Sequence, residues 1–310
     1  MSTGRATHWL EYACFEVAKW KLRYLPEGMA LWYGSTLGWF LGSVVGIRRD
    51  VVERNLEVAF PEKSREWRDR VATASYSHLG REAVATLRMA WMTPQEIVER
   101  TTIEGFEAFS DALAEGKGVI LATGHLGSWE AGAACLAARG VPVDGVTKAM
   151  SNKRFGQALA DTRERLGYRN LDVSDAPRAV PRSLKEGRMV ALLGDQNIRK
   201  GGVFVPFFGS PAATARGVAT FALRTGAPVF LGVAVHEPGR PHRYRGVLER
   251  IPVEPTGDTE HDIRRITAAH TAALERLVRE YPEQYFWQHK RWDTRPLEGG
   301  SPELPSGEAV

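Results

Sequence analysis

Residues 118–140, GVILATGHLGSWEAGAACLAARG, constrain the fold of this 310-residue chain more tightly than any other stretch. The apolar run 119–122 is bounded by glycine, too short for a helix and typical of a buried strand. An Ala- and Leu-rich segment follows over residues 127–139, and Gly140 ends it as glycine commonly ends a helix. The stretch therefore predicts a strand, a tight turn and a helix.

Two polar residues lie where this predicted strand gives way to the helix. His125 falls in the turn and Glu130 lies one turn into the helix. On one continuous helix, five steps of about 100° would place the two side chains roughly 140° apart. We therefore expect them to meet only if His125 lies off the helix end and folds back over its first turn. Open α/β sheets bind ligands at the carboxyl ends of their strands, so the pair is interpreted as a base with its orienting carboxylate. The alternative is a surface hydrogen bond without a role in catalysis.

GHLGSWE is a His-x4-Glu motif, and three further segments accompany it in the chain. These are Asn55-Leu56 with Ala59-Phe60-Pro61, then Gly194-Asp195-Gln196-Asn197 with residues 204–209 (FVPFFG), then residues 285–292 (YFWQHKRW) with Thr294-Arg295-Pro296. Together and in this order they resemble the lipid A biosynthesis acyltransferases, the lauroyl and myristoyl transferase family. The resemblance covers about residues 25–296.

The resemblance implies transfer of a fatty acyl chain from a thioester donor to a hydroxyl group on a lipid. It also implies an α/β fold with a mixed central sheet flanked by helices, like that of glycerol-3-phosphate acyltransferases. His125 then acts as the general base, for which its pKa near neutrality is suited, and Glu130 holds the imidazole in one tautomer. No covalent nucleophile is expected. Neither a metal nor a tightly bound cofactor is expected, only an acyl carrier protein or CoA thioester as co-substrate.

Four further residues are candidates for substrate binding. Arg163 and Arg165 close an amphipathic segment, and the resemblance implies an essential arginine there that contacts phosphate on the lipid or the donor. Arg163 is the preferred candidate, and a solvated charged helix face is the alternative. Asp195 and Gln196 follow a predicted strand just as His125 does, so the two turns are expected to converge. Asp195 is expected to position a substrate or to support Arg163, or else to cap a helix. Trp129, Phe204, Phe207 and Phe208 are candidates for the wall of an acyl groove or for the core.

Residues 29–47, MALWYGSTLGWFLGSVVGI, carry no charge over a length near that of a membrane span. Glycine recurs every fourth residue, at Gly34, Gly38, Gly42 and Gly46, which on a helix forms one smooth ridge. In water each glycine costs about 1 kcal/mol relative to alanine, whereas membrane helices use such ridges for close packing. We interpret the segment as a hydrophobic anchor helix, either spanning or interfacial, and a buried core helix is the alternative.

The remaining sequence alternates predicted strands and helices, which indicates an α/β sheet with helices on both faces. Strands are expected at 141–146, 171–173, 189–193, 228–235 and 243–251, and helices at 151–167, 176–186, 211–225 and 258–281. The expected division is a membrane-associated segment over 1–49, an acyltransferase domain over 50–296 and a disordered tail over 297–310.

The net charge of +4 suits an acidic partner without identifying it. The preferred reading is a lipid A late acyltransferase on the cytoplasmic face of the inner membrane, with acyl carrier protein as donor and a phosphorylated glycolipid as acceptor. An acyl-CoA-dependent glycolipid or lysophospholipid acyltransferase remains the nearest alternative. A nucleotide- or nucleic-acid-binding protein is disfavoured because G-x-G-x-x-G and P-loop motifs are absent. A hydrolase is disfavoured because the chain lacks G-x-S-x-G, although Ser128 lies close to His125.

Overall fold

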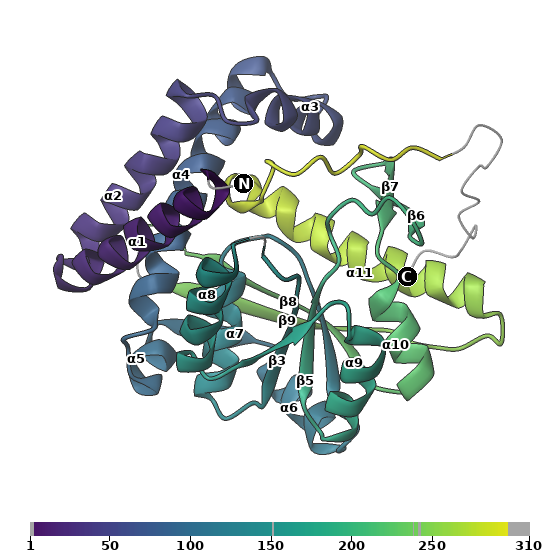
Figure 1. Cartoon of the computed structure of the whole chain (residues 1–310). Helices are drawn as coiled ribbons and strands as arrows, with labels where there is room; N and C mark the ends of the chain where they lie inside the picture. Colours follow the sequence, from purple (N-terminus) through teal and green to yellow (C-terminus); the bar gives the residue numbers. More distant parts are fainter. Residues whose placement is uncertain (1–2, 151, 238, 241–242, 297–310) are drawn as a thin grey trace.

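A computed structural model of the chain describes residues 3–150, 152–237, 239–240 and 243–296. A central sheet of seven strands, in the order β1-β9-β8-β2-β5-β3-β4, carries helices on both faces (Figure 1). β8 and β9 pair antiparallel and the other neighbours pair parallel, so the sheet is mixed as the sequence predicted. The expected tail at 297–310 lies outside the described residues.

The strands of the sheet are β1 (Thr101–Glu104), β2 (Val119–Thr123), β3 (Val143–Thr147), β4 (Arg169–Asp172), β5 (Met189–Leu193), β8 (Val229–His236) and β9 (Tyr244–Ile251), and β6 (Val203–Phe207) and β7 (Ser210–Thr214) form a separate hairpin. The helices are α1 (Thr3–Tyr24), α2 (Glu27–Trp39), a π-helix (Phe40–Val44), α3 (Arg49–Ala59), α4 (Arg65–Met89), α5 (Pro94–Glu99), α6 (Phe106–Ala114), α7 (Trp129–Ala138), α8 (Lys153–Arg165), α9 (Ala176–Lys185), α10 (Gly217–Thr225), α11 (Thr259–Glu280) and a 3-10 turn (Pro282–Gln284).

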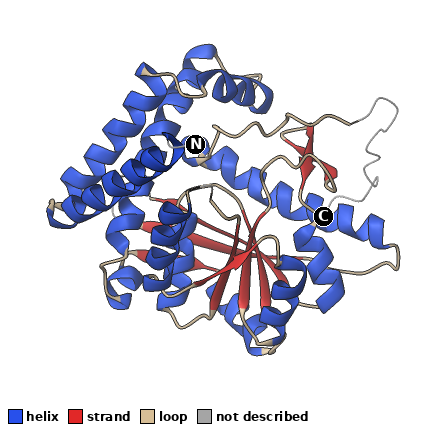
Figure 2. Cartoon of the chain, viewed as in Figure 1, coloured by secondary structure: helices blue, strands red, loops and turns tan. Residues whose placement is uncertain are grey.

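Strand β2 shows why both faces of the sheet are covered. Its residues alternate between faces, and nearly all are buried. Ile120 and Ala122 pack in a core with residues of α9, α10 and α11. Val119 and Leu121 pack on the other face with residues of α5, α6 and α7. Figure 2 shows this arrangement of one sheet between two sets of helices.

The sequence prediction was wrong over residues 201–216. We expected a helix from residue 211, but Ser210–Thr214 is β7, paired antiparallel with β6, and α10 begins only at Gly217. Pro211 suggested a helical first turn, yet in the hairpin it lies directly opposite Pro206. Strand β1 was also not predicted, because it is a four-residue edge strand with only one fully buried residue.

The predicted glycine ridge is confirmed for Gly34, Gly38 and Gly42, which pack against protein, whereas Gly46 lies beyond the helix with a φ of 75° and no neighbour within 4 Å. A Cβ atom on Gly34 would lie 2.6 Å from the Gly80 carbonyl oxygen, and one on Gly38 would lie 2.0 Å from the Tyr76 carbonyl oxygen. A Cβ on Gly42 would overlap the Tyr76 ring. The ridge therefore lets α2 and its π-helical extension lie against α4, beside the sheet (upper left in Figure 1).

The side of this N-terminal unit that does not face α4 is apolar and exposed. Large side chains in residues 9–47 remain uncovered, among them Trp20, Trp32, Tyr33, Trp39, Phe40 and Val44. Trp32, for example, is 68% exposed. Within the described residues, no single helix has both the length and the apolar composition needed to cross a bilayer. The only pair that does so together, Glu27–Val44 with Arg49–Ala59, is bent by 90°. Residues 29–47 therefore do not form the single continuous anchor helix that the sequence predicted, but an interrupted helix with exposed apolar side chains.

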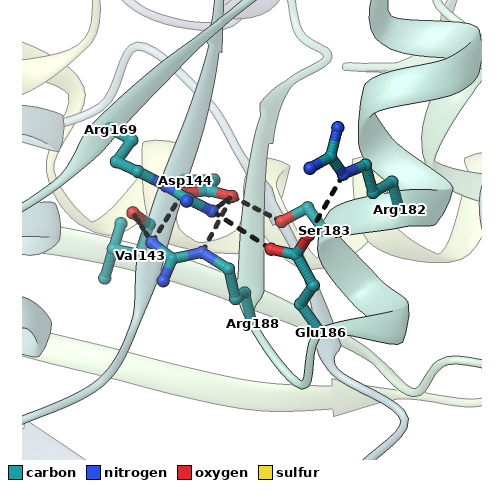
Figure 3. Close-up of polar contacts among 7 residues, drawn as sticks. All are labelled: Val143, Asp144, Arg169, Arg182, Ser183, Glu186 and Arg188. Atoms are coloured by element: carbon teal, nitrogen blue, oxygen red, sulfur yellow. Dashed lines mark hydrogen bonds and ion pairs between the residues drawn. The ribbon is translucent and has the colours of Figure 1, made fainter.

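A buried carboxylate on β3 bonds residues at the amino ends of β4 and β5 (Figure 3). Asp144 of β3 is fully buried and accepts hydrogen bonds from Arg169 of β4, from Arg188 just before β5 and from Ser183 of α9. Burial alone would raise the pKa of Asp144, but these donors lower it to about 2. Arg169 and Glu186 add a peripheral ion pair.

We expect Asp144→Ala to reduce the free energy of unfolding by about 3 kcal/mol, because it leaves the partly buried Arg188 without a counter-charge. Urea unfolding measures this, and the effect should be on stability alone, since the cluster lies at the strand ends opposite His125. The pKa of Asp144 is lowered on folding, so its stabilisation is present above the ordinary value of 3.8 and lost as pH falls towards 2. The alanine variant should therefore lose less stability than the wild type over that pH range.

Candidate active site

His125 and Asp195 are brought together by the register of two neighbouring strands. β2 and β5 run parallel with Thr123 opposite Leu193, so the residues two positions beyond each strand end meet at the carboxyl edge. Asp195 accepts two hydrogen bonds from His125, one from the backbone N–H and one from the ring Nδ1, each at 2.7 Å. The prediction that the two turns converge is confirmed.

The pair is largely withdrawn from solvent, with side chains 17% and 3% exposed for His125 and Asp195. Burial would raise the pKa of Asp195, but the charge and hydrogen bonds of His125 lower it to about 2. Burial would lower the pKa of His125, and the carboxylate of Asp195 more than offsets this and raises it. With Nδ1 donating to an ionised carboxylate, the neutral ring has its lone pair on Nε2.

The carboxylate that orients His125 is therefore Asp195, and the prediction that Glu130 does so is wrong. Glu130 is buried in the first turn of α7 and accepts hydrogen bonds from Arg163, with Nη2 at 2.6 Å and Nε at 3.2 Å. The hydroxyl of Tyr168 and the indole N–H of Trp129 also donate to it. Glu130 thus lies within the site but bonds the guanidinium of Arg163 and not His125. Tyr168 was missed because no sequence motif includes it.

Of the two candidate arginines, only Arg163 lies at the site. Its Nη1 also donates to Asn170 at 3.1 Å, so the guanidinium is held from two sides. Arg165 is exposed and lines a separate groove between α1 and α8. The predicted support of Arg163 by Asp195 is not what the structure has, since Glu130 fills that role. Gln196 lies at the site, with Nε2 3.3 Å from His125 Nε2.

The turn that carries His125 is fixed by backbone contacts to two other segments. Gly127 adopts a positive φ of 64°, and a Cβ there would lie 2.1 Å from the Ala234 carbonyl oxygen, so only glycine fits. The N–H groups of Gly127 and Phe286 bond the carbonyls of Gln284 and His125. His78 Nε2 lies 3.2 Å from the Gly127 oxygen. The turn that carries His125 is therefore held by β8, by α4 and by the C-terminal segment, residues 284–294.

The remaining family motifs meet in one aromatic cluster that holds the C-terminal segment. Its rings are those of Phe60, Trp67, Phe207, Phe208, Tyr285, Trp287 and Trp292. Asn55 Nδ2 donates to the backbone carbonyls of Trp287 and His289. Phe207 and Phe208 therefore belong to the core and not to an acyl groove. Trp129, another candidate for the wall of an acyl groove, lies beside His125 with ring centroids 5.0 Å apart.

An apolar cavity lies between α7 and the sheet, next to the paired rings of Trp129 and His125. Trp129, Thr123, Glu130 and Arg163 line one part of it, and it continues over β2, β3, β5, β8 and β9. Small residues create the space, among them Gly132, Ala133 and Gly145. The site thus combines an imidazole paired with a carboxylate, a partly buried guanidinium and an apolar cavity.

Two other features bear on the chemistry of the site, namely Ser128 and the groups that could bind a metal. Ser128 is buried and its hydroxyl accepts from the Ala131 N–H, which makes it the N-cap of α7. Among the parts of the chain that the structure describes, no group of three or more His, Cys, Asp or Glu side chains has a metal-binding arrangement.

Comparison with known proteins agrees with this arrangement. The profile of the family described as "Bacterial lipid A biosynthesis acyltransferase" matches residues 3–294. The chain is 27% identical to the lipid A biosynthesis palmitoleoyltransferase of Escherichia coli K12 over 94% of its own length and 93% of the relative's. It is 28% identical to the lauroyltransferase of the same organism over 93% of both. It is also 25% identical to the phosphatidylinositol mannoside acyltransferase of Mycolicibacterium smegmatis over 72% of this chain and 71% of that protein. The chain therefore belongs to the bacterial lipid A biosynthesis acyltransferases and is an acyltransferase.

Proposed function

We propose that this protein transfers a fatty acyl chain from an acyl carrier protein thioester to a hydroxyl group of a lipid A precursor, with His125 as the general base. The observation that carries the proposal is the His125–Asp195 pair beside an apolar cavity. The full-length similarity to lipid A acyltransferases supports the acceptor. The net charge of +4 suits an acidic carrier and a phosphorylated lipid.

The reaction needs one proton carrier. The acceptor hydroxyl gives its proton to His125 Nε2 as its oxygen bonds to the thioester carbonyl carbon. When the tetrahedral intermediate collapses, the C–S bond breaks and the imidazolium returns the proton to the leaving thiol. Asp195 keeps Nδ1 protonated and stabilises the imidazolium, as the carboxylate of a catalytic triad does. The acceptor hydroxyl is proposed to bind beside His125 Nε2, where the Gln196 amide nitrogen lies 3.3 Å away.

Arg163 is proposed to bind an anionic oxygen of a substrate. Its side chain is 16% exposed, lines the cavity and is oriented by Glu130 and Asn170. A guanidinium held by a buried carboxylate is preorganised and loses little freedom when it binds phosphate. Glu130, the glutamate of the His-x4-Glu motif, is then a positioning residue for Arg163.

The cavity under α7 is proposed to hold the acyl chain. Its wall begins at Trp129, which packs against the His125 ring, so a chain inside it places its thioester next to the base. Each methylene buried there contributes about 0.8 kcal/mol, which favours long chains. No metal or tightly bound cofactor is needed for this transfer.

The exposed apolar face of residues 9–47 is proposed to hold the enzyme on the cytoplasmic side of the inner membrane. Exposed tryptophan, tyrosine and aliphatic side chains on neighbouring helices are typical of binding at the membrane interface. Lys21, Arg23 and Arg48 are exposed near it and favour anionic lipid headgroups. A lipid acceptor would then reach the site from the bilayer.

We expect the triple variant Trp32→Ser, Trp39→Ser, Phe40→Ser to bind phosphatidylglycerol-containing vesicles at least about tenfold more weakly, because three apolar side chains no longer enter the lipid. Vesicle co-sedimentation measures this. The three positions are exposed, so the unfolding temperature should stay within a few degrees of the wild type and serves as the control. Unchanged vesicle binding would rule out this face as the membrane contact.

The proposed function is tested by incubating the purified protein with acyl carrier protein and CoA thioesters against several acceptor lipids, with mass spectrometry of the products. We expect one added acyl group on the lipid A precursor with the carrier thioester. The second candidate is an acyl-CoA-dependent glycolipid acyltransferase, which the similarity to phosphatidylinositol mannoside acyltransferases favours. Transfer from CoA to a mannoside alone would select it. Absence of transfer with every pair would reject both.

A further inference from the structure

A second imidazole, that of His289, lies at the same site. It belongs to the C-terminal segment that bonds the catalytic turn through the Phe286 N–H and the His125 carbonyl. Its own backbone carbonyl accepts a hydrogen bond from Asn55, so its position is fixed from the N-terminal side as well. The charges of both Asp195 and His125 act on its pKa, which places the ring within their field.

The turn after β5 contacts both imidazoles with three consecutive residues. Asp195 accepts from His125 Nδ1, and Gln196 lies next to His125 Nε2. The backbone N–H of Asn197 donates to His289 Nε2 at 2.9 Å. The side chain of Asn197 exchanges two hydrogen bonds with Thr294, at 3.0 and 3.2 Å, so this turn and the C-terminal segment form one unit. The two rings are therefore contacted by consecutive residues of one turn.

The contact with Asn197 fixes the tautomer of His289. A backbone N–H needs a lone pair on Nε2, so the proton of the neutral ring is on Nδ1. Burial lowers the pKa of His289, which keeps the ring uncharged near neutral pH. Among the described residues no protein group bonds Nδ1, and this atom is not among the buried atoms without a partner. Among the parts of the chain that the structure describes, His289 thus has one N–H donor without a protein partner.

The geometry points to His289 as a catalytic hydrogen-bond donor to the carbonyl oxygen of the acyl thioester, through its Nδ1–H. This rests on the proposed function of the site. His125 removes the proton of the hydroxyl, and the negative charge that develops on the carbonyl oxygen needs a donor within reach of the same carbon. A neutral imidazole with a lowered pKa can polarise a carbonyl in this way without giving up its proton. No net proton moves through His289, so the balance of the reaction is unchanged.

Two substitutions separate the two ring nitrogens. His289→Gln places an amide oxygen near the position of Nε2, where it still accepts from Asn197, but it has no group at Nδ1. His289→Asn places an amide N–H near Nδ1 and leaves Asn197 without its acceptor. We expect kcat about 10²- to 10³-fold lower in the glutamine variant with KM little changed, and less than about tenfold lower in the asparagine variant. His261→Gln, at the exposed start of α11, should have wild-type rates and is the control.

The opposite order of the two variants would show that His289 acts through Asn197 and would overturn the inference. Equal losses in both variants, or no loss in either, would overturn it as well. A wild-type protein without any transfer activity would instead reject the proposed function. In that case the Nδ1–H tautomer, measured by ¹⁵N NMR of histidine-labelled protein at pH 7, still tests the geometry: protonation on Nε2 contradicts it.

Discussion

Replacing Asp195 with asparagine is expected to lower kcat for acyl transfer by about 10³- to 10⁴-fold while leaving the protein folded. The asparagine keeps the size of the side chain, but its NH₂ group cannot accept from His125 Nδ1. The ring then favours the tautomer with its proton on Nε2, and the lone pair is lost from the atom that faces the substrate. Steady-state kinetics with the acyl donor that the wild type uses measures the effect.

The pH profile gives this prediction a second readout. Burial lowers the pKa of His125 and Asp195 raises it further than that, to above its usual value. Activity of the wild type should fall as pH drops through this raised pKa, because the protonated ring is no longer a base. In Asp195→Asn, the acid limb of kcat/KM should move to lower pH. A limb at the wild-type position would mean that Asp195 does not set the state of the base.

Glu130→Gln is the matched comparison, since it also removes one carboxylate from the site. Glu130 bonds Arg163 and not His125, so its loss should disorder the guanidinium and raise KM, without shifting the pH limb. Were Glu130→Gln to shift the acid limb and Asp195→Asn to leave it in place, the roles of the two carboxylates would be those that the sequence spacing suggested.

The sequence prediction paired His125 with the wrong carboxylate, for a physical reason. His125 and Glu130 are neighbours in the chain, and spacing arguments see only such neighbours. The true partner of His125 comes from a strand 70 residues away, placed by hydrogen-bonded register between β2 and β5. Both strands had been predicted, each followed two residues later by one of the pair. The missing information was that these two strands are adjacent, which depends on the packing of the whole sheet.

The same limit explains what the sequence could not tell about the C-terminal motif. Residues 285–292 mix aromatic and basic side chains, a mixture that occurs both at membrane headgroup depth and in segments that close a fold. Trp287 is fully buried and Arg291 is 2% exposed, so the closing role holds for these two. Only contacts between distant segments, such as the Phe286 N–H with the His125 carbonyl, show that the C-terminal segment supports the turn that carries His125.

A larger side chain at Gly145 is expected to fill part of the cavity proposed to bind the acyl chain, and so to shorten the chain that it accepts. Gly145 of β3 lines the cavity, and a Cβ at this position would meet only the Arg169 carbonyl oxygen, at 4.0 Å. Its φ lies outside the left-handed region, so a larger side chain needs no change of backbone. We therefore expect Gly145→Leu to reduce transfer of the longest chain that the wild type uses by about tenfold or more relative to shorter chains, since one methylene that does not fit costs roughly 1–3 kcal/mol.

Competition between acyl donors of different length, with product lipids quantified by mass spectrometry, measures this preference. Gly145→Ala is the control, because it removes the glycine from β3 but adds only one methyl group, and it should leave the chain-length profile nearly unchanged. Both variants should retain the rate of the wild type on the shortest donors, since Gly145 touches neither His125 nor Asp195. An unaltered profile in Gly145→Leu, with the protein folded, would mean that the chain binds elsewhere and that the cavity under α7 is a packing void.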